Sequence, residues 1–303
     1  LWIMYWPPWL EIFVPTIPKR WMSSPHGCCP ASGHGAAAAP QGYRPQGLIW
    51  QVGGVECYVV GDGNRAVVVG HDVFGMSSGR TKAICDDLAE SLGIIVALPT
   101  FFDGGCCGRP RAADAIAKMK TGANLCEKFV NYVRGLRHLP TFLRAMNEHS
   151  WDVVGPKFHN DVLPMLQARG VKRIGLLGFC WGGWLVFHAS ASPLVCCGVS
   201  MHPSQVKLSA QLKENFEQLC KDIQCPQMVL SAGDDQAATK ENGLAHRLLG
   251  SKPFGADCQF QTFPAMRHGW VNRGSLDDPA VAADYQRAMA MAKEFFRKHL
   301  LEE

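Results

Sequence analysis

Residues 173–183 read RIGLLGFCWGG, an apolar run followed by a glycine-rich turn. Residues 184–191 then show the amphipathic pattern of a helix. Strand, tight turn and helix in this order are typical of a nucleophile elbow, in which the turn lifts one side chain above a sheet. Gly178 and Gly182 stand two positions to either side of Cys180, where the close approach of backbone segments requires small residues. The sequence therefore predicts that Cys180 occupies the tip of an elbow.

A cysteine at this position places a thiol where such elbows usually carry a hydroxyl. The thiolate is a strong nucleophile, and an adjacent base or a helix N-terminus can generate it near neutral pH. A buried cysteine in a glycine-rich turn, without a chemical role, is the alternative interpretation of Cys180.

The chain from Gly47 onward alternates short β-rich runs with longer helical stretches. This alternation predicts a mostly parallel sheet covered by helices on both faces, in one domain over residues 47–303. Strands are expected at 57–60, 66–69, 94–98, 173–177, 195–201, 227–231 and 258–263, and helices at 81–92, 184–191 and 281–300. Pro99 is expected to end the strand that begins at Ile94.

The composition is that of an ordered globular protein with a mild charge. Of the 303 residues, 47% are hydrophobic and 18% are charged, which is ample material for a core. The net charge is +4 and no long run of Lys and Arg occurs. Nucleic acid is therefore not expected as a partner.

Residues 1–46 are expected to form a mobile leader. Prolines break the apolar stretches of residues 1–21, and the basic pair Lys19-Arg20 follows these stretches instead of preceding them. This order fits neither a signal peptide nor a membrane span, so no membrane association is expected. Our hypothesis is that Met22 is the natural start and that residues 1–21 are translated upstream sequence.

The 13 cysteines include three adjacent pairs, which do not resemble the framework of a secreted, disulfide-rich domain. Reduced thiols in the cytoplasm are the simpler interpretation. A metal site could use a group of residues near the N-terminus, namely His26, Cys28, Cys29 and His34. Because this group lacks a spaced second pair of ligands, no metal or other cofactor is expected.

An acid and a base follow Cys180 in the order that an α/β-hydrolase requires. The buried strand 227–231 runs into Gly233-Asp234-Asp235, where a carboxylate would lie at the carboxyl edge of the sheet. The strand 258–263 leads to His268, where the base belongs. Spacing alone does not separate Asp234 from Asp235, and each could simply be a carboxylate in a solvated turn.

Two other histidines compete with His268 for the role of base. His71 precedes the nucleophile and His202 precedes both aspartates, so the chain order disfavours them.

An oxyanion hole needs two backbone N–H groups. One is expected from Trp181, directly after the nucleophile, and the other from residues 70–75. A lid is expected over residues 103–142, where a Gly/Cys-rich loop precedes interrupted helical segments.

Four motifs of the chain together resemble those of the dienelactone hydrolase (carboxymethylenebutenolidase) family. The resemblance extends from about Tyr43 to the C-terminus. The four motifs are the elbow at 178–183, Gly-x-Asp at 233–235, His-Gly-aromatic-x-x-Arg-Gly at 268–274, and His-Asp-Val-Phe-Gly at 71–75. The resemblance implies that Cys180 is the nucleophile, Asp235 the acid and His268 the base.

The same resemblance implies further roles. Val73 would supply the second oxyanion N–H, and Asp72 would modulate the nucleophile from the position of the family glutamate, one methylene shorter. Arg273 would bind a substrate carboxylate, aided by Arg109 or Arg111, although no motif aligns the latter two. Trp181 would line the pocket.

The implied activity is hydrolysis of a small lactone or ester through a thioacyl-enzyme. We expect the protein to be a monomer in the cytoplasm. Two alternatives stay open. One is a general carboxylesterase of the same fold, and the other is a binding or thiol-sensing protein that has the hydrolase fold but no turnover.

Overall fold

The computed structural model describes residues 33–35, 37–101, 127, 129–134, 136–137 and 149–302. Several sequence-based predictions fall outside these residues. They are the proposed start at Met22, the metal-ligand candidates other than His34, the two loop arginines, and most of the expected lid.

The described residues form one mixed sheet of eight strands, in the order β1-β2-β4-β3-β5-β6-β7-β8. Pairs β1–β2 and β2–β4 are antiparallel, and the remaining pairs are parallel. The predicted, mostly parallel sheet is therefore confirmed. The strands are β1 (Leu48–Val52), β2 (Val55–Val60), β3 (Arg65–Gly70), β4 (Ile95–Thr100), β5 (Arg173–Phe179), β6 (Val195–Met201), β7 (Gln227–Ala232) and β8 (Gln259–Phe263).

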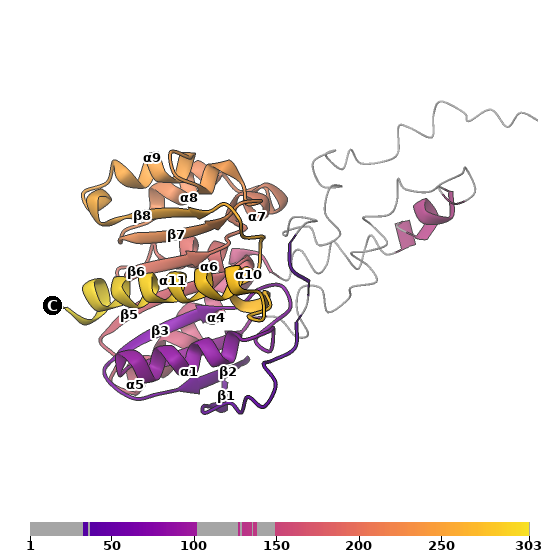
Figure 1. Ribbon diagram of the computed structural model, residues 1–303. Coiled ribbons are helices and arrows are strands. Elements are labelled where there is room, and N and C mark those ends of the chain that lie inside the picture. The colour runs from indigo at the N-terminus through magenta and orange to yellow at the C-terminus, as the bar shows by residue number, and fades with distance from the viewer. Residues whose placement is uncertain are drawn as a thin grey trace, which may run out of the picture.

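Helices cover both faces of this sheet. Helices α1 (Thr81–Leu92) and α11 (Pro279–Phe296) cross one face (Figure 1). The other face is covered by α4 (Trp151–Lys157), α5 (Leu163–Ala168), α6 (Trp181–Ala189) and α8 (Phe216–Asp222). The remaining labelled helices are α7 (Gln205–Leu212), α9 (Leu244–Gly250) and α10 (Trp270–Arg273). Short π-helical turns span Phe158–Val162 and Arg297–Leu301, and 3₁₀ turns span Ala237–Thr239 and Gly255–Asp257.

The central strands are mostly apolar because side chains from both of their faces are buried. Val67 and Val69 pack toward α1 and α11, whereas Val68 packs toward the opposite helices. Two hydrophobic cores result, one on each side of the sheet. This arrangement fixes the carboxyl ends of the parallel strands, from which the loops described below emerge.

The predicted end of the strand before Pro99 was wrong. β4 does not end before Pro99 but continues to Thr100. Pro99 pairs only with β2, because the pairing of β3 with β4 ends at Ala97, so the missing N–H breaks no bond on the β3 side. Helix α6 begins at Trp181, the residue expected at the start of the helix, because the elbow passes directly into it.

Part of the expected leader packs against the domain. The His34 N–H donates to the carbonyl of His268 at 2.7 Å, and the Gly79 N–H donates to the carbonyl of Ala37 at 2.9 Å. Tyr43 bonds through its hydroxyl to Asp86 at 2.5 Å. His34 therefore lies beside the loop that carries His268, whereas Ala37 and Tyr43 lie against Gly79 and helix α1.

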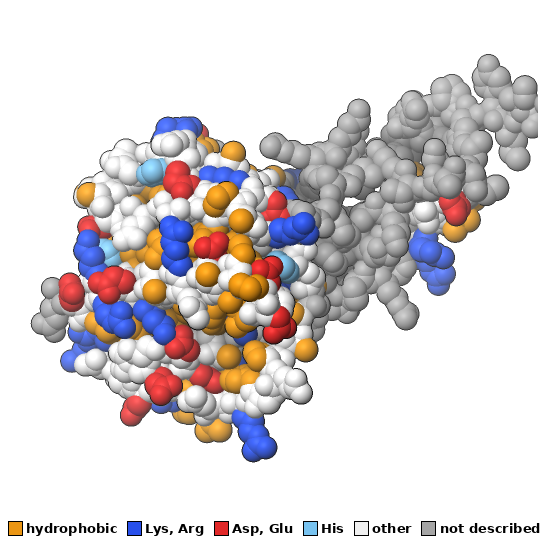
Figure 2. Space-filling model, viewed as in Figure 1, with side chains coloured by type: hydrophobic (Ala, Val, Ile, Leu, Met, Phe, Trp, Pro, Cys, Tyr) orange, Lys and Arg blue, Asp and Glu red, His pale blue; other side chains and the backbone are white. Residues whose placement is uncertain are grey.

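The surface over α1 and α11 carries interspersed positive and negative side chains (Figure 2). Within the described residues, no helix combines the length and apolar character needed to cross a membrane.

Candidate active site

Cys180 occupies a strained turn between β5 and α6. Its φ of 55° and ψ of −107° lie outside the regions that ordinary residues adopt, as expected for a nucleophile elbow. A Cβ added at Gly178 would collide with the backbone of Gly182, and one added at Gly182 would collide with the backbone of Gly70. The expected need for glycine at both flanking positions is therefore confirmed.

Ser204 contacts the thiol of Cys180 through its hydroxyl. Its Oγ lies 3.4 Å from Cys180 Sγ, within hydrogen-bonding distance for sulfur. Its backbone N–H also donates to the carbonyl of Cys180 at 3.0 Å, and the Cys180 N–H donates to the carbonyl of Met201 at 3.2 Å. The loop after β6 thus holds both the backbone and the side chain of Cys180. Sequence analysis missed Ser204, although its place just after a buried strand was a usable signal.

His268 is paired with Asp235 and not with Asp234. Its Nδ1 lies 2.6 Å from Oδ1 of Asp235, and both side chains are buried. The other oxygen of Asp235 accepts the Ala232 N–H at 2.7 Å. Asp234 instead accepts the backbone N–H of His268 at 2.7 Å. One aspartate therefore contacts the imidazole, and the other fixes the backbone that carries it.

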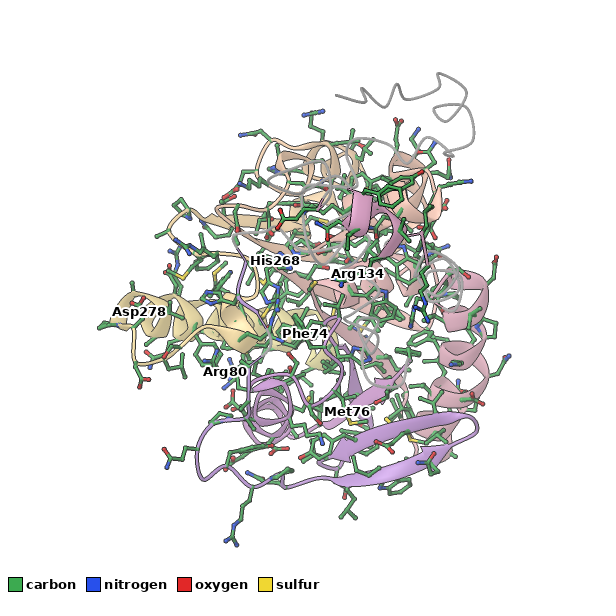
Figure 3. All side chains as sticks on the ribbon, turned by 90° about the vertical axis from the view of Figure 1, so that its right-hand side faces the viewer. Phe74, Met76, Arg80, Arg134, His268 and Asp278 are labelled. Atoms are coloured by element: carbon green, nitrogen blue, oxygen red, sulfur yellow. The ribbon has the colours of Figure 1, made fainter. Side chains whose placement is uncertain are left out.

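Burial raises the pKa of Asp235, and the adjacent His268 opposes this rise. The Nδ1 contact leaves Nε2 as the ring atom that can exchange a proton with another group. His268 is near the centre of Figure 3, as is Phe74 from the loop after β3.

His202 connects the surroundings of Cys180 and His268. The register pairs Phe179 with Met201, so the next residues, Cys180 and His202, leave neighbouring strands at the same level. The ring centroids of His202 and His268 are 5.1 Å apart, with an interplanar angle of 70°. Burial, followed by the charge of His268, lowers the pKa of His202 well below its usual value, and Cys180 also acts on this group electrostatically.

The loop after β3 is anchored by Asp72. The Asp72 carboxylate accepts the Phe74 N–H at 2.8 Å and the Ser78 hydroxyl at 2.8 Å. It also accepts the Asn272 amide at 2.7 Å. Within the described residues, the buried Val73 N–H between these anchors donates no hydrogen bond. Asn272 was not predicted as a site residue.

Arg273 is buried beside Asp72. Its Nε lies 3.0 Å from Asp72 Oδ2, and its Nη1 donates to the carbonyl of His34 at 2.5 Å. The guanidinium also lies over the ring of Phe74, 4.7 Å from the centroid. Burial raises the pKa of Asp72, Arg273 opposes that rise, and the charge of Cys180 adds to it. The ion pair therefore lies close enough to affect the thiol electrostatically.

His71 faces Trp181 across the start of α6. Its Nδ1 donates to the carbonyl of Asp72 at 2.7 Å, and its ring stacks on Trp181 with centroids 5.6 Å apart. Burial lowers the pKa of His71 to about 4, so this ring is neutral near pH 7. Trp184 is buried on the next turn and donates to Glu214 at 2.7 Å.

No cluster of three or more His, Cys, Asp or Glu side chains that could hold a metal occurs in the part of the chain that the structure describes. The described residues at this edge of the sheet supply a thiol, imidazoles, carboxylates and backbone amides.

A mostly parallel sheet with an elbow after β5 and a histidine loop after β8 defines the α/β-hydrolase class. The structure is similar to a crystal structure of dienelactone hydrolase from Anabaena variabilis, with a TM-score of 0.50 and 16% identity, covering 85% of this chain and 98% of that one. The model of the dienelactone hydrolase family matches residues 55–300. The chain belongs to this family, and it is therefore a hydrolase that acts on ester bonds.

Curated relatives match over most of their length. An uncharacterized AIM2 family protein of Schizosaccharomyces pombe is 29% identical over 277 residues, covering 89% of this chain and 98% of the relative. A carboxymethylenebutenolidase homolog of Rattus norvegicus is 27% identical, with 85% and 93% coverage. The hydrolase tropI of Talaromyces stipitatus is 23% identical, with 86% and 95% coverage.

Proposed function

We propose that this protein hydrolyses a small lactone or ester through a thioacyl-enzyme formed on Cys180. The observation that carries the proposal is the pairing of His268 with Asp235 at 2.6 Å, on the same sheet edge as the cysteine elbow. A reactive thiol, an oriented base and an orienting carboxylate together form the minimal set for nucleophilic acyl transfer.

The first half of the proposed reaction acylates the thiol. His268 Nε2 takes the proton of Cys180, Sγ attacks the carbonyl carbon, and a tetrahedral intermediate forms. Its oxyanion is stabilised by the N–H groups of Val73 and Trp181, and loss of one such donor typically costs about 10²–10³ in rate. The protonated His268 then gives its proton to the leaving oxygen as the ester bond breaks. The start of α6 also favours the thiolate, because helix N-termini stabilise negative charge.

The second half releases the acid. His268 takes a proton from water, the resulting hydroxide attacks the thioester carbonyl, and the same two amides stabilise the oxyanion. Collapse of this intermediate breaks the carbon–sulfur bond and expels the thiolate, and the protonated His268 returns its proton to the sulfur. Asp235 stabilises the imidazolium in both halves and holds Nδ1 as the donor, so Nε2 faces the reaction.

Asp72 modulates the nucleophile through two effects in this proposal. Its carboxylate fixes the turn that presents the Val73 N–H, because it accepts the next N–H along the chain. Its charge, balanced by Arg273, also acts on the thiol. Ser204 complements it by holding Sγ in one position before substrate binds.

The Asp72–Arg273 pair favours a second candidate function, a carboxylesterase for small neutral esters. A substrate carboxylate would have to compete with Asp72 for the guanidinium, and Arg273 is fully buried as well. Ester substrates without a carboxylate avoid that competition. A panel of neutral aryl esters and carboxylated lactones discriminates between the two functions, because only the lactone specialist prefers the carboxylated substrates.

The proposed location is the cytoplasm. There the protein would act as a monomer on a small-molecule substrate, and we propose no nucleic acid, membrane or cofactor as a partner. None of the cysteines in the described residues forms a disulfide, which supports a location in a reducing compartment.

The test compares Cys180→Ala with Cys180→Ser, using 4-nitrophenyl acetate as substrate. Alanine is expected to reduce turnover to background. Serine is expected to leave a small residual rate, because its hydroxyl is far less ionised than a thiol. Full turnover by Cys180→Ala would refute the mechanism. Stability measurements on both variants exclude unfolding as the cause of lost activity.

A further inference from the structure

His202 holds the same position on β6 that Cys180 holds on β5. Phe179 pairs with Met201 in the parallel register. The residue after each of them, Cys180 and His202 respectively, has a positive φ. The φ is 55° at Cys180 and 40° at His202. Non-glycine residues rarely adopt this region, and such strain concentrates at functional sites.

The ring of His202 has aromatic neighbours and, within the described residues, no hydrogen-bond partner. It is fully buried, stacks on Phe179 with centroids 5.9 Å apart, and meets His268 edge-on. Neither ring nitrogen forms a hydrogen bond with any residue that the structure describes. A buried polar group without a hydrogen bond destabilises the fold, so a polar ring at such a position points to a ligand that bonds it.

The sheet order places His202 on a defined side of the nucleophile. β5 lies between β3 and β6, so the oxyanion loop after β3 and His202 after β6 flank Cys180 on opposite sides. His268, which gives its proton to the leaving oxygen in the proposed reaction, is adjacent to His202. The side of the site that contains His202 is therefore the leaving-group side.

We propose that His202 is a substrate-binding residue that hydrogen-bonds a neutral oxygen, a hydroxyl or carbonyl group, in the leaving-group part of the ester or lactone. This proposal rests on the proposed hydrolase function and adds a specificity determinant to it.

The chemistry of the ring matches an uncharged ligand group. Burial, His268 and Arg273 lower the pKa of His202, so the imidazole is neutral near pH 7. A neutral imidazole offers one N–H donor and one acceptor nitrogen, which suits a hydroxyl or carbonyl group.

The test uses two esters of equal size, 2-hydroxyethyl butyrate and propyl butyrate. Their alcohol parts differ only in the terminal group, which is a hydroxyl in the first and a methyl in the second. Initial rates measured by pH-stat give kcat/KM for each. The wild-type protein is expected to prefer the hydroxyethyl ester. His202→Phe keeps an aromatic ring but removes both nitrogens, and it should lower this preference by about tenfold, the value of one neutral hydrogen bond. Propyl butyrate hydrolysis should change far less.

Two further variants define the effect. His202→Gln keeps a donor and an acceptor and should restore part of the preference. His246→Phe is the matched control, because His246 lies outside the site and stacks on Phe260 with centroids 4.6 Å apart. It should leave the ratio unchanged. An equal ratio in wild-type protein and His202→Phe, or an equal loss for both esters, would overturn the proposal.

A binding measurement on the wild-type protein covers the case in which His202→Phe fails to fold. The histidine side chains are labelled with ¹⁵N, and N-(2-hydroxyethyl)butyramide or N-propylbutyramide is added as a non-hydrolysed analogue. The His202 resonances, assigned with His202→Gln, should shift much more with the hydroxylated amide. Equal shifts would overturn the inference. Failure of the wild-type protein to hydrolyse any ester would refute the proposed function, and the binding comparison would still decide the role of His202.

Discussion

The guanidinium Nε of Arg273 lies 3.0 Å from Oδ2 of Asp72, and both side chains are fully buried. This ion pair joins the loop after β3 to the segment that follows His268. Asn272 donates to the same carboxylate oxygen at 2.7 Å, which doubles the connection. The proposed oxyanion donor and the proposed base are thus carried by two loops that are fastened to each other.

Breaking this pair from one side should destabilise the fold strongly. Asp72→Asn leaves the charge of Arg273 buried and unpaired, for which we expect a loss of about 3–5 kcal/mol in the free energy of unfolding. Arg273→Met should cost a similar amount. The double variant should lose less than the sum of the two, because it removes both charges. Urea denaturation of all four proteins measures this coupling, and strict additivity would contradict it.

The two adjacent aspartates should differ in their effect on catalysis. Asp235→Asn removes the acceptor that orients the imidazole, and we expect kcat to fall by about 10²–10⁴. Asp234→Asn is the matched control. Its side chain accepts the backbone N–H of His268 at 2.7 Å instead of contacting the imidazole, and we expect a decrease of about tenfold or less. Similar losses in both variants would show that the imidazole contact is not the source of the effect.

Thiol alkylation should separate the cysteines by environment. We expect iodoacetamide at pH 7 to label two thiols rapidly, that of Cys180 and that of Cys196, which lies outside the candidate site. The contact with Cys197 and the charge of Arg173 lower the pKa of Cys196 to about 7, although burial opposes this. Labelling of Cys196 should therefore increase with pH across about pH 6–8, as its thiolate fraction rises.

Burial raises the pKa of Cys57 and Cys220 to about 12, so these two thiols should stay unlabelled at pH 7. Peptide mapping by mass spectrometry measures all four sites in one sample. Slow and uniform labelling of every cysteine would argue against an activated thiolate at Cys180.

The fold could be predicted largely from local patterns. The apolar runs of β5, β6 and β7 and the helical period of α1 identify the parallel sheet, because buried parallel strands leave continuous apolar sequences. The antiparallel edge strand β1 was not predicted. Its residues Leu48 and Ile49 are exposed, so burial imposes no clear pattern there. The continuation of β4 through Pro99 depends on which neighbouring strand pairs at that level, a tertiary property.

The candidate site was predictable only where a motif or chain order marks it. Cys180, Asp235 and His268 follow from the elbow and the order of the chain, together with family resemblance for the choice of aspartate. Ser204 and His202 belong to no such motif, and their relevance follows from the pairing of β5 with β6. The pairing of Arg273 with Asp72 also depends on a contact between loops 200 residues apart, as the nearby Asn272–Asp72 bond illustrates.

The central claim is that the acyl group is carried by the sulfur of Cys180. Rapid acid quenching of the wild-type protein during turnover of 4-nitrophenyl butyrate, followed by peptide mapping, tests this directly. We predict one butyryl group on the peptide that contains Cys180, lost on treatment with neutral hydroxylamine and absent in Cys180→Ala. A butyryl group on Ser204 or another residue, with turnover retained in Cys180→Ala, would contradict the account.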